Sequence, residues 1–91
     1  MKNEINGLVS LAVEGASTAL EMLLVEVKDF VFNLSLRMLG TVHDAEDAAQ
    51  EVLIKIMTNL SAFRKEAGFH TWVYRITTNF LLDYKKSMFS K

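Results

Sequence analysis

The sequence predicts an all-α fold, a compact bundle of about four helices. Apolar residues recur at intervals of three and four along most of the 91 residues, which is the spacing of amphipathic helices. The chain has no proline and only four glycines, which argues against a sheet built on tight turns. Short connections between helices favour antiparallel neighbours, and a chain of this length supports a single core.

The N-terminal element, residues 1–15, is expected to hold a short helix over 5–13 that Gly15 caps. The second helix is expected over 17–39, where Thr18 and Glu21 have the spacing of a capping box. It is apolar nearly all round, so we expect it to be buried between other helices or covered by a partner. A kink near 28–29 is compatible with the pattern, and Gly40 should end the helix.

The third helix is expected over 44–62, with Asp44 as its N-cap and further acids in its first turn. Its outward face carries Asp47, Gln50, Glu51 and Ile54 at helical spacing. A branched apolar residue in line with two acids and an amide indicates a docking surface. The alternative is an ordinary solvated face with one exposed isoleucine. The inward face repeats apolar residues at Ala45, Ala48, Ala49, Val52, Leu53, Ile56, Met57 and Leu60.

A loop over 63–70 leads to a last helix over 71–88, for which Thr71 is an N-cap candidate. Trp72 and Phe69 fall among apolar positions and are expected in the core. Asn79 carries an amide that suits either a base edge or a hydrogen bond within the fold. Cations beside aromatic rings are typical of single-stranded nucleic-acid binding. This half of the chain combines Arg64, Lys65, Arg75, Lys85 and Lys86 with Phe63, Phe69, His70, Trp72 and Tyr74.

Charge is divided unevenly along the chain, although the net charge is only −1. Residues 1–60 hold four Lys or Arg and nine Asp or Glu, a balance of −5, whereas residues 61–91 hold six and two, a balance of +4. Such a division suits a protein that meets a different partner with each half, and chance partition in a small domain is the alternative.

Several functional classes lack support in the composition. There is no cysteine, which fits a cytoplasmic protein and leaves no disulfide or thiolate metal site. We expect no signal peptide and no membrane insertion, because no apolar run approaches the roughly 18–20 residues that cross a bilayer. No catalytic motif occurs, so we expect no enzyme activity, no cofactor and no metal. The cluster of His43, Asp44, Glu46 and Asp47 is explained by an acidic first turn.

Three linked segments carry a family resemblance. LRMLG at 36–40, DAEDAAQEV at 44–52 and FRKEAGFHTWVYRITTN at 63–79 follow one another at the spacings found in region 2 of bacterial RNA polymerase sigma factors. The chain most resembles the extracytoplasmic-function group, over residues 17–86. Each segment alone is weak, but the three together are a strong signal.

The resemblance implies two partners and assigns residues to each. In this family the third helix docks on the clamp helices of the largest subunit of the polymerase core. Its docking positions match Asp47, Gln50, Glu51 and Ile54, with Leu53 and Met57 at the margin. This is the same outward face that the spacing singles out, and it implies a transcription initiation factor.

The second implied partner is the promoter minus-ten element, bound as single-stranded non-template DNA with one base flipped into a protein pocket. Residues 63–70 match the specificity loop, with Phe63, Arg64, Lys65, Glu66, Ala67, Gly68 and His70 as the expected contacts. Asn79 matches a pocket position, Lys85 and Lys86 would hold flanking phosphates, and Arg75 belongs to the same basic series.

Two departures from the wider family are visible. Arg75 and Ile76 stand where housekeeping sigma factors carry a tryptophan pair that melts DNA, which implies the extracytoplasmic-function group and a stricter promoter dependence. No segment matches the domain that reads the minus-thirty-five element, so we expect an excised domain or a relative that lost it. The rival hypothesis is a helical protein–protein module using the 20–39 helix, or a decoy that binds polymerase or an anti-sigma factor without DNA.

Overall fold

The computed structural model describes residues 2–63 and 68–89, and helices account for nearly all of them. The elements are α1 (Lys2–Val13), α2 (Ser17–Leu39), α3 (Val42–Thr58), the short 3-10 helix η1 (Leu60–Ala62) and α4 (Phe69–Phe89). No strand occurs within these residues, so the all-α prediction is confirmed. None of the helices in this part of the chain combines the length and apolar character needed to cross a bilayer.

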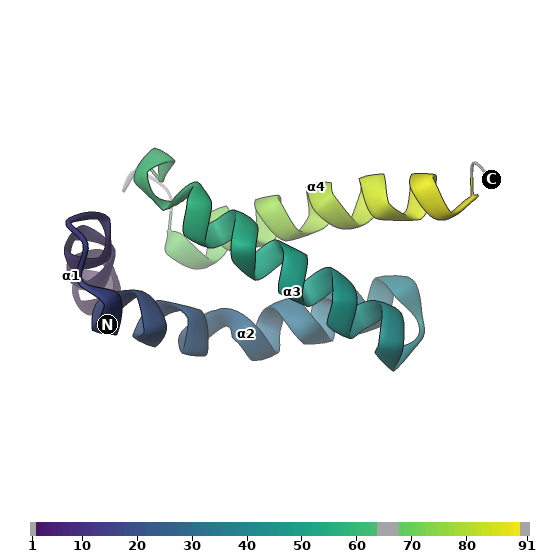
Figure 1. Ribbon diagram of the computed structural model, residues 1–91, viewed down its shortest axis with the longest axis horizontal. Helices are drawn as coiled ribbons and strands as arrows, with labels where there is room; N and C mark the ends of the chain where they lie inside the picture. The colour runs from purple at the N-terminus through teal and green to yellow at the C-terminus, as the bar shows by residue number, and fades with distance from the viewer. Residues whose placement is uncertain (1, 64–67, 90–91) are drawn as a thin grey trace.

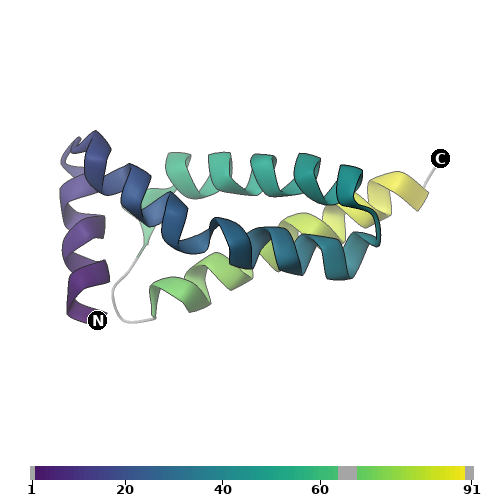
Figure 2. The same ribbon diagram turned by 90° about the horizontal axis from the view of Figure 1, so that it is seen from below.

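Helix α2 is the centre of the domain and packs against each of the other three α-helices. Helix α3 returns antiparallel to α2 after a two-residue connection, and α4 then runs back along both (Figure 1). Helix α1 lies across one end of this three-helix layer, as the turned view shows (Figure 2). The domain is consequently elongated, with extents of 42 × 22 × 21 Å.

The core lies along α2 and is filled by aliphatic side chains from α3 and α4. Buried side chains include Leu23, Val27 and Val31 of α2, Val52 and Ile56 of α3, and Val73 and Leu81 of α4. Ala45 and Ala48 are also fully buried, and small side chains let α3 approach its neighbours closely.

Two hydroxyl groups are buried in this core without partners on other helices. Ser35 Oγ of α2 donates to the carbonyl of Val31 at 2.7 Å, and Thr77 Oγ1 of α4 donates to the carbonyl of Val73 at 2.7 Å. Hydroxyls that bond one turn back along their own helix can be buried at little cost. Thr77 and Leu81 are, with Val73, the most buried positions of α4.

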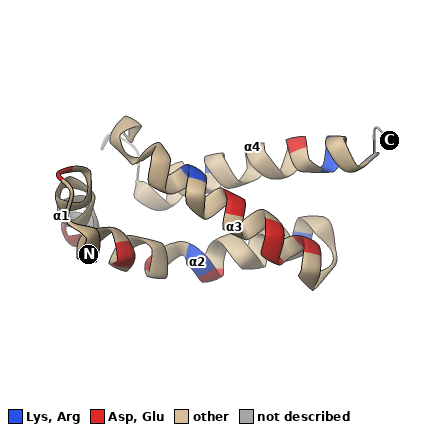
Figure 3. Ribbon diagram, viewed as in Figure 1, with Lys and Arg blue, Asp and Glu red and all other residues tan. Residues whose placement is uncertain are grey.

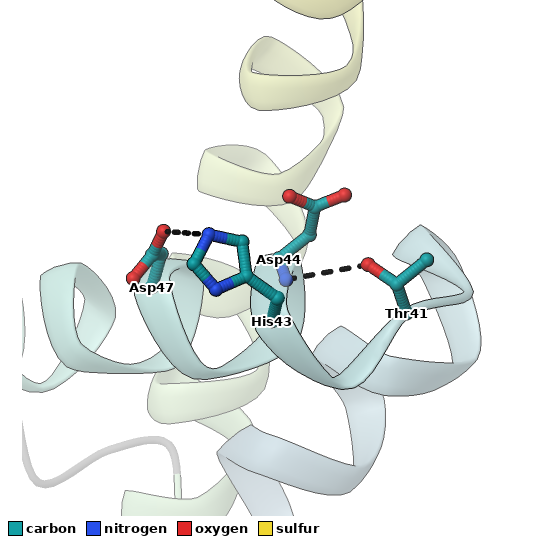
Figure 4. Close-up of polar contacts among 4 residues, drawn as sticks. All are labelled: Thr41, His43, Asp44 and Asp47. Carbon is teal, nitrogen blue, oxygen red and sulfur yellow. Dashed lines mark hydrogen bonds and ion pairs between the residues drawn. The ribbon is translucent and has the colours of Figure 1, made fainter.

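The prediction that Asp44 caps the third helix is wrong. Thr41 has the extended conformation of an N-cap, and its Oγ1 accepts a hydrogen bond from the Asp44 backbone N–H at 3.3 Å (Figure 4). The helix therefore starts at Val42, because Val42 and His43 continue the helical backbone after a competent threonine cap. Asp44 keeps its place in the first turn, where a carboxylate favours the helix dipole.

The other two predicted N-caps are also wrong. Helix α2 begins at Ser17 after Ala16 with no side-chain cap, so Thr18 and Glu21 form no capping box. Helix α4 begins at Phe69 rather than after Thr71, because the Trp72 N–H already donates to the Gly68 carbonyl at 3.0 Å.

The predicted helix ends at glycine are confirmed. Gly15 and Gly40 have φ of 107° and 87°, a left-handed conformation that glycine adopts without penalty. Helix α2 runs unbroken from Ser17 to Leu39 and ends before Gly40.

Candidate functional site

The outward face of α3 is the first candidate surface, and the structure leaves it open. Asp47, Gln50 and Glu51 are exposed, and Ile54 lies among them with 42% of its surface exposed. Figure 3 shows how acidic positions follow this helix. This face points to solvent because the opposite side of α3 is buried in the core, through Ala45, Ala48, Val52 and Ile56. Of the two predicted marginal residues, Leu53 is half-buried and Met57 is 38% exposed.

Other polar groups at the start of α3 interact locally. His43 Nε2 lies 3.6 Å from Asp47 Oδ2, one turn along the exposed surface (Figure 4). Burial, followed by the charges of Asp44 and Asp47, raises the pKa of Tyr84 above its ordinary value. The acidic end of α3 is therefore close enough to the second half of α4 to influence its phenol. The residues that the structure describes contain no group of three or more His, Asp or Glu suited to a metal ion.

The second candidate surface is a cavity of about 550 Å³ between the end of α3 and the middle of α4. Lys55, Asn59 and Ala62 form one wall, and Trp72, Ile76, Asn79, Phe80 and Asp83 form the other. The Lys55 ammonium lies 5.7 Å from the centroid of the Phe80 ring. The cavity thus joins aromatic surfaces to amides and to one charge of each sign, a combination that suits a flat polar ring such as a nucleobase.

An aromatic cluster of Phe63, Phe69 and Trp72 adjoins this cavity, which Trp72 lines. Phe63 packs edge-on against Phe69 with centroids 5.5 Å apart, and both rings pack against Trp72 at 5.3 and 5.9 Å. Phe63 and Phe69 flank the segment 64–68 in sequence, so the cluster holds together the two residues on either side of it. Arg64, Lys65, Glu66 and Ala67 lie outside the described residues, whereas Gly68 is exposed directly before α4.

The predicted DNA contacts do not share one surface. Asn79 is exposed and lines the cavity. Arg75, one turn before it, and Lys86, two turns after it, share its side of α4. His70 precedes Asn79 by about two and a half turns and therefore lies on the opposite side.

Three other predicted contacts, His70, Lys85 and Phe63, do not line the Asn79 cavity. His70 Nε2 lies 3.9 Å from Glu26 Oε1 of α2, and His70 lines a separate cavity of about 530 Å³ beside α1. Lys85 is half-buried off this side, and Phe63 has only 8% of its surface exposed. Because its ring is buried, Phe63 is better suited to anchoring the segment that follows it than to contacting DNA.

The sequence match that decides the family covers most of this fold. The model of the Sigma-70 region 2 family matches residues 23–88, which include α3, the cavity and nearly all of α4. The chain belongs to this family. Its sigma region 2 fold also resembles the solved structure of an engineered region 2 of sigmaE in complex with GTAAAA. That likeness has a TM-score of 0.82 and 30% identity, over 91% of this chain and 86% of the other.

The curated relatives confirm the resemblance to the extracytoplasmic-function group. The ECF RNA polymerase sigma factor SigW of Bacillus subtilis is 48% identical over 56 residues, which are 62% of this chain and 30% of the relative. The ECF RNA polymerase sigma-E factor of Escherichia coli K12 is 34% identical over 77 residues, 85% of this chain and 40% of the relative. The chain therefore spans well under half the length of these relatives.

Three polar residues of the sigma region 2 cavity were missed from sequence. Lys55 and Asn59 lie one turn apart, at the end of α3, on one side of the cavity. Asp83 lies one turn beyond Asn79 on α4. The sequence shows that Asp83 shares a side of the last helix with Asn79, and that Lys55 and Asn59 share a side of the third helix and its end. The missing information was which side of α4 faces the end of α3.

Proposed function

We propose that this sigma region 2 domain binds the RNA polymerase core and recognises the promoter minus-ten element as single-stranded non-template DNA. The observation that carries the proposal is the likeness, at a TM-score of 0.82, to a region 2 solved in complex with GTAAAA. The two candidate surfaces have separate partners, because α3 meets the polymerase, while α4 and the segment before it meet the DNA.

The chemistry of the α3 face supports docking on the clamp helices of the largest polymerase subunit. Ile54 supplies an apolar centre, and Asp47 and Glu51 supply acids beside it. Interfaces of this kind are anchored by central apolar contacts, while surrounding charges steer encounter and set orientation. A basic partner helix pair would complement this face.

The cavity beside Asn79 supports capture of a flipped base. Trp72 and Phe80 present ring surfaces to the cavity, and Asn79 presents an amide that both donates and accepts hydrogen bonds. Stacking a base on an aromatic side chain contributes about 1–3 kcal/mol, which offsets the few kcal/mol lost when the base leaves its stack. Arg75 and Lys86, on the same side of α4, are placed to follow the flanking phosphates.

The exposed apolar side chains of α2 favour a second candidate function. Met22 and Val25 are 53% and 61% exposed, and Phe30 is 37% exposed beside Tyr74 of α4, with ring centroids 6.3 Å apart. Such a surface suits a protein partner, for which an anti-sigma factor is the candidate. A domain that used only this surface and α3 would act as a decoy without DNA recognition.

The first experiment compares Glu51→Lys with Glu21→Lys for binding to isolated clamp helices. Both residues are exposed acids, but Glu21 lies on α2, away from the α3 face. We expect Glu51→Lys to weaken binding at least about tenfold, since it places a like charge against a basic partner, while both variants unfold within about 0.5 kcal/mol of the unsubstituted domain. Unchanged binding by Glu51→Lys would remove the docking assignment, and equal losses would indicate unspecific attraction.

A labelled library of single-stranded minus-ten oligonucleotides, added to the same mixture, tests the DNA half of the proposal. Selection of a short motif supports promoter recognition. Binding of polymerase without any selection supports the decoy function instead.

A further inference from the structure

Lys55 is the one cationic side chain among the described residues that line the Asn79 cavity. It belongs to the last turn of α3, on the helix assigned to polymerase, and its side chain is exposed. The ammonium lies over the Phe80 ring at 5.7 Å from the centroid, so it stands at the cavity rather than on the outward face of α3.

The Lys55 side chain points to the cavity although its own helix offers an acidic partner. Glu51 precedes Lys55 by one turn, the spacing at which a glutamate and a lysine readily pair. Across the described part of the chain, however, Lys55 takes part in no ion pair. The helix therefore presents Glu51 outward, with Ile54, and directs the neighbouring Lys55 across to α4.

The two sides of the cavity carry charges of opposite sign. Lys55 supplies a positive charge on the α3 side, and Asp83 supplies a negative charge on the α4 side. A nucleotide that entered with its phosphate beside Asp83 would meet a like charge. Its favoured orientation therefore places the phosphate on the α3 side, with the base turned toward Trp72 and Asn79.

We propose that Lys55 binds a phosphate of the single-stranded DNA at the mouth of this cavity, so that the DNA interface extends from α4 onto α3. The inference rests on the proposed function and adds a residue of α3 to its DNA site. A lysine is a flexible point charge that binds phosphate without reading a base. Lys55 accordingly contributes affinity and salt dependence, whereas base choice stays with α4 and the segment before it.

The test measures binding of a labelled minus-ten oligonucleotide across a salt series for the unsubstituted domain, Lys55→Met and Lys55→Arg. Methionine keeps most of the apolar stem against Phe80 but removes the charge. Loss of one phosphate contact to a single strand lowers the slope of log affinity against log salt by about 0.7. If the curves converge near 1 M salt, Lys55→Met binds about fivefold more weakly at 0.1 M. Lys55→Arg should keep the slope.

Lys28→Met is the matched control, because Lys28 is an exposed lysine of α2 away from the cavity. It should leave the slope unchanged. Lys55→Met should also keep the base preference and the affinity for clamp helices. An unchanged slope, or a changed base preference, in Lys55→Met would overturn the phosphate assignment alone. Failure of the unsubstituted domain to bind any oligonucleotide would overturn both the proposed DNA function and this inference.

Discussion

Phe63→Leu tests whether the aromatic cluster holds the predicted specificity loop in place. Phe63 packs against Phe69 and Trp72 at 5.5 and 5.3 Å between centroids. Each aromatic pair contributes about 0.5–1.5 kcal/mol beyond the area it buries, so losing two costs about 1–3 kcal/mol. A 91-residue domain has a total stability of about 5–14 kcal/mol, so the variant should remain folded.

The assay is urea unfolding of Phe63→Leu beside Phe32→Leu. Phe32 is half-buried against the core on α2, and it has no ring partner among the described residues. The same exchange there should cost less than about 1.5 kcal/mol. We further expect Phe63→Leu to flatten base selection in the oligonucleotide library while clamp-helix binding persists. Equal destabilisation of the two variants, or intact selection in Phe63→Leu, would refute this role of the cluster.

Two further predictions concern stability and ionisation. Gly40→Ala should destabilise the domain by about 1–2 kcal/mol, because a φ of 87° strains any side chain. Gly7→Ala within α1 should instead stabilise it by about 0.5–1 kcal/mol. A loss of stability in both variants, measured by thermal unfolding, would contradict this. The raised pKa of Tyr84 means that its stabilising contribution is complete below pH 10.0 and disappears as pH rises through the folded-state pKa. Absorbance titration should show that pKa above the ordinary value, and Asp44→Asn should lower it.

The helices and the outward face of α3 could be predicted because both depend on spacing within one segment. Ile54 and its acidic neighbours share a face whatever α3 packs against. Two N-cap predictions were wrong for a local reason. Thr41 and Gly68 each precede the predicted cap by three residues and accept a hydrogen bond from the first turn, and spacing alone does not rank such competitors.

The DNA site could be predicted only in part, because it forms between helices. Spacing indicates that His70 and Asn79 lie on opposite sides of α4, but not which side meets the end of α3. Lys55 was overlooked for the same reason, since its cavity exists only once α3 and α4 are packed. Thr77 was not expected in the core because a hydroxyl there needs a partner, which the carbonyl one turn earlier provides.

The continuity of α3 constrains how such a domain can diverge. Ile54 and Lys55 are adjacent residues of one unbroken helix, yet they face different partners in the proposals above. Inserting one residue before them would rotate both by about 100° and misalign the two interfaces together. Helix α3 should therefore accept substitutions but not changes in length. New promoter preferences would then arise mainly in the segment before α4 and in α4 itself, while α3 preserves the common geometry.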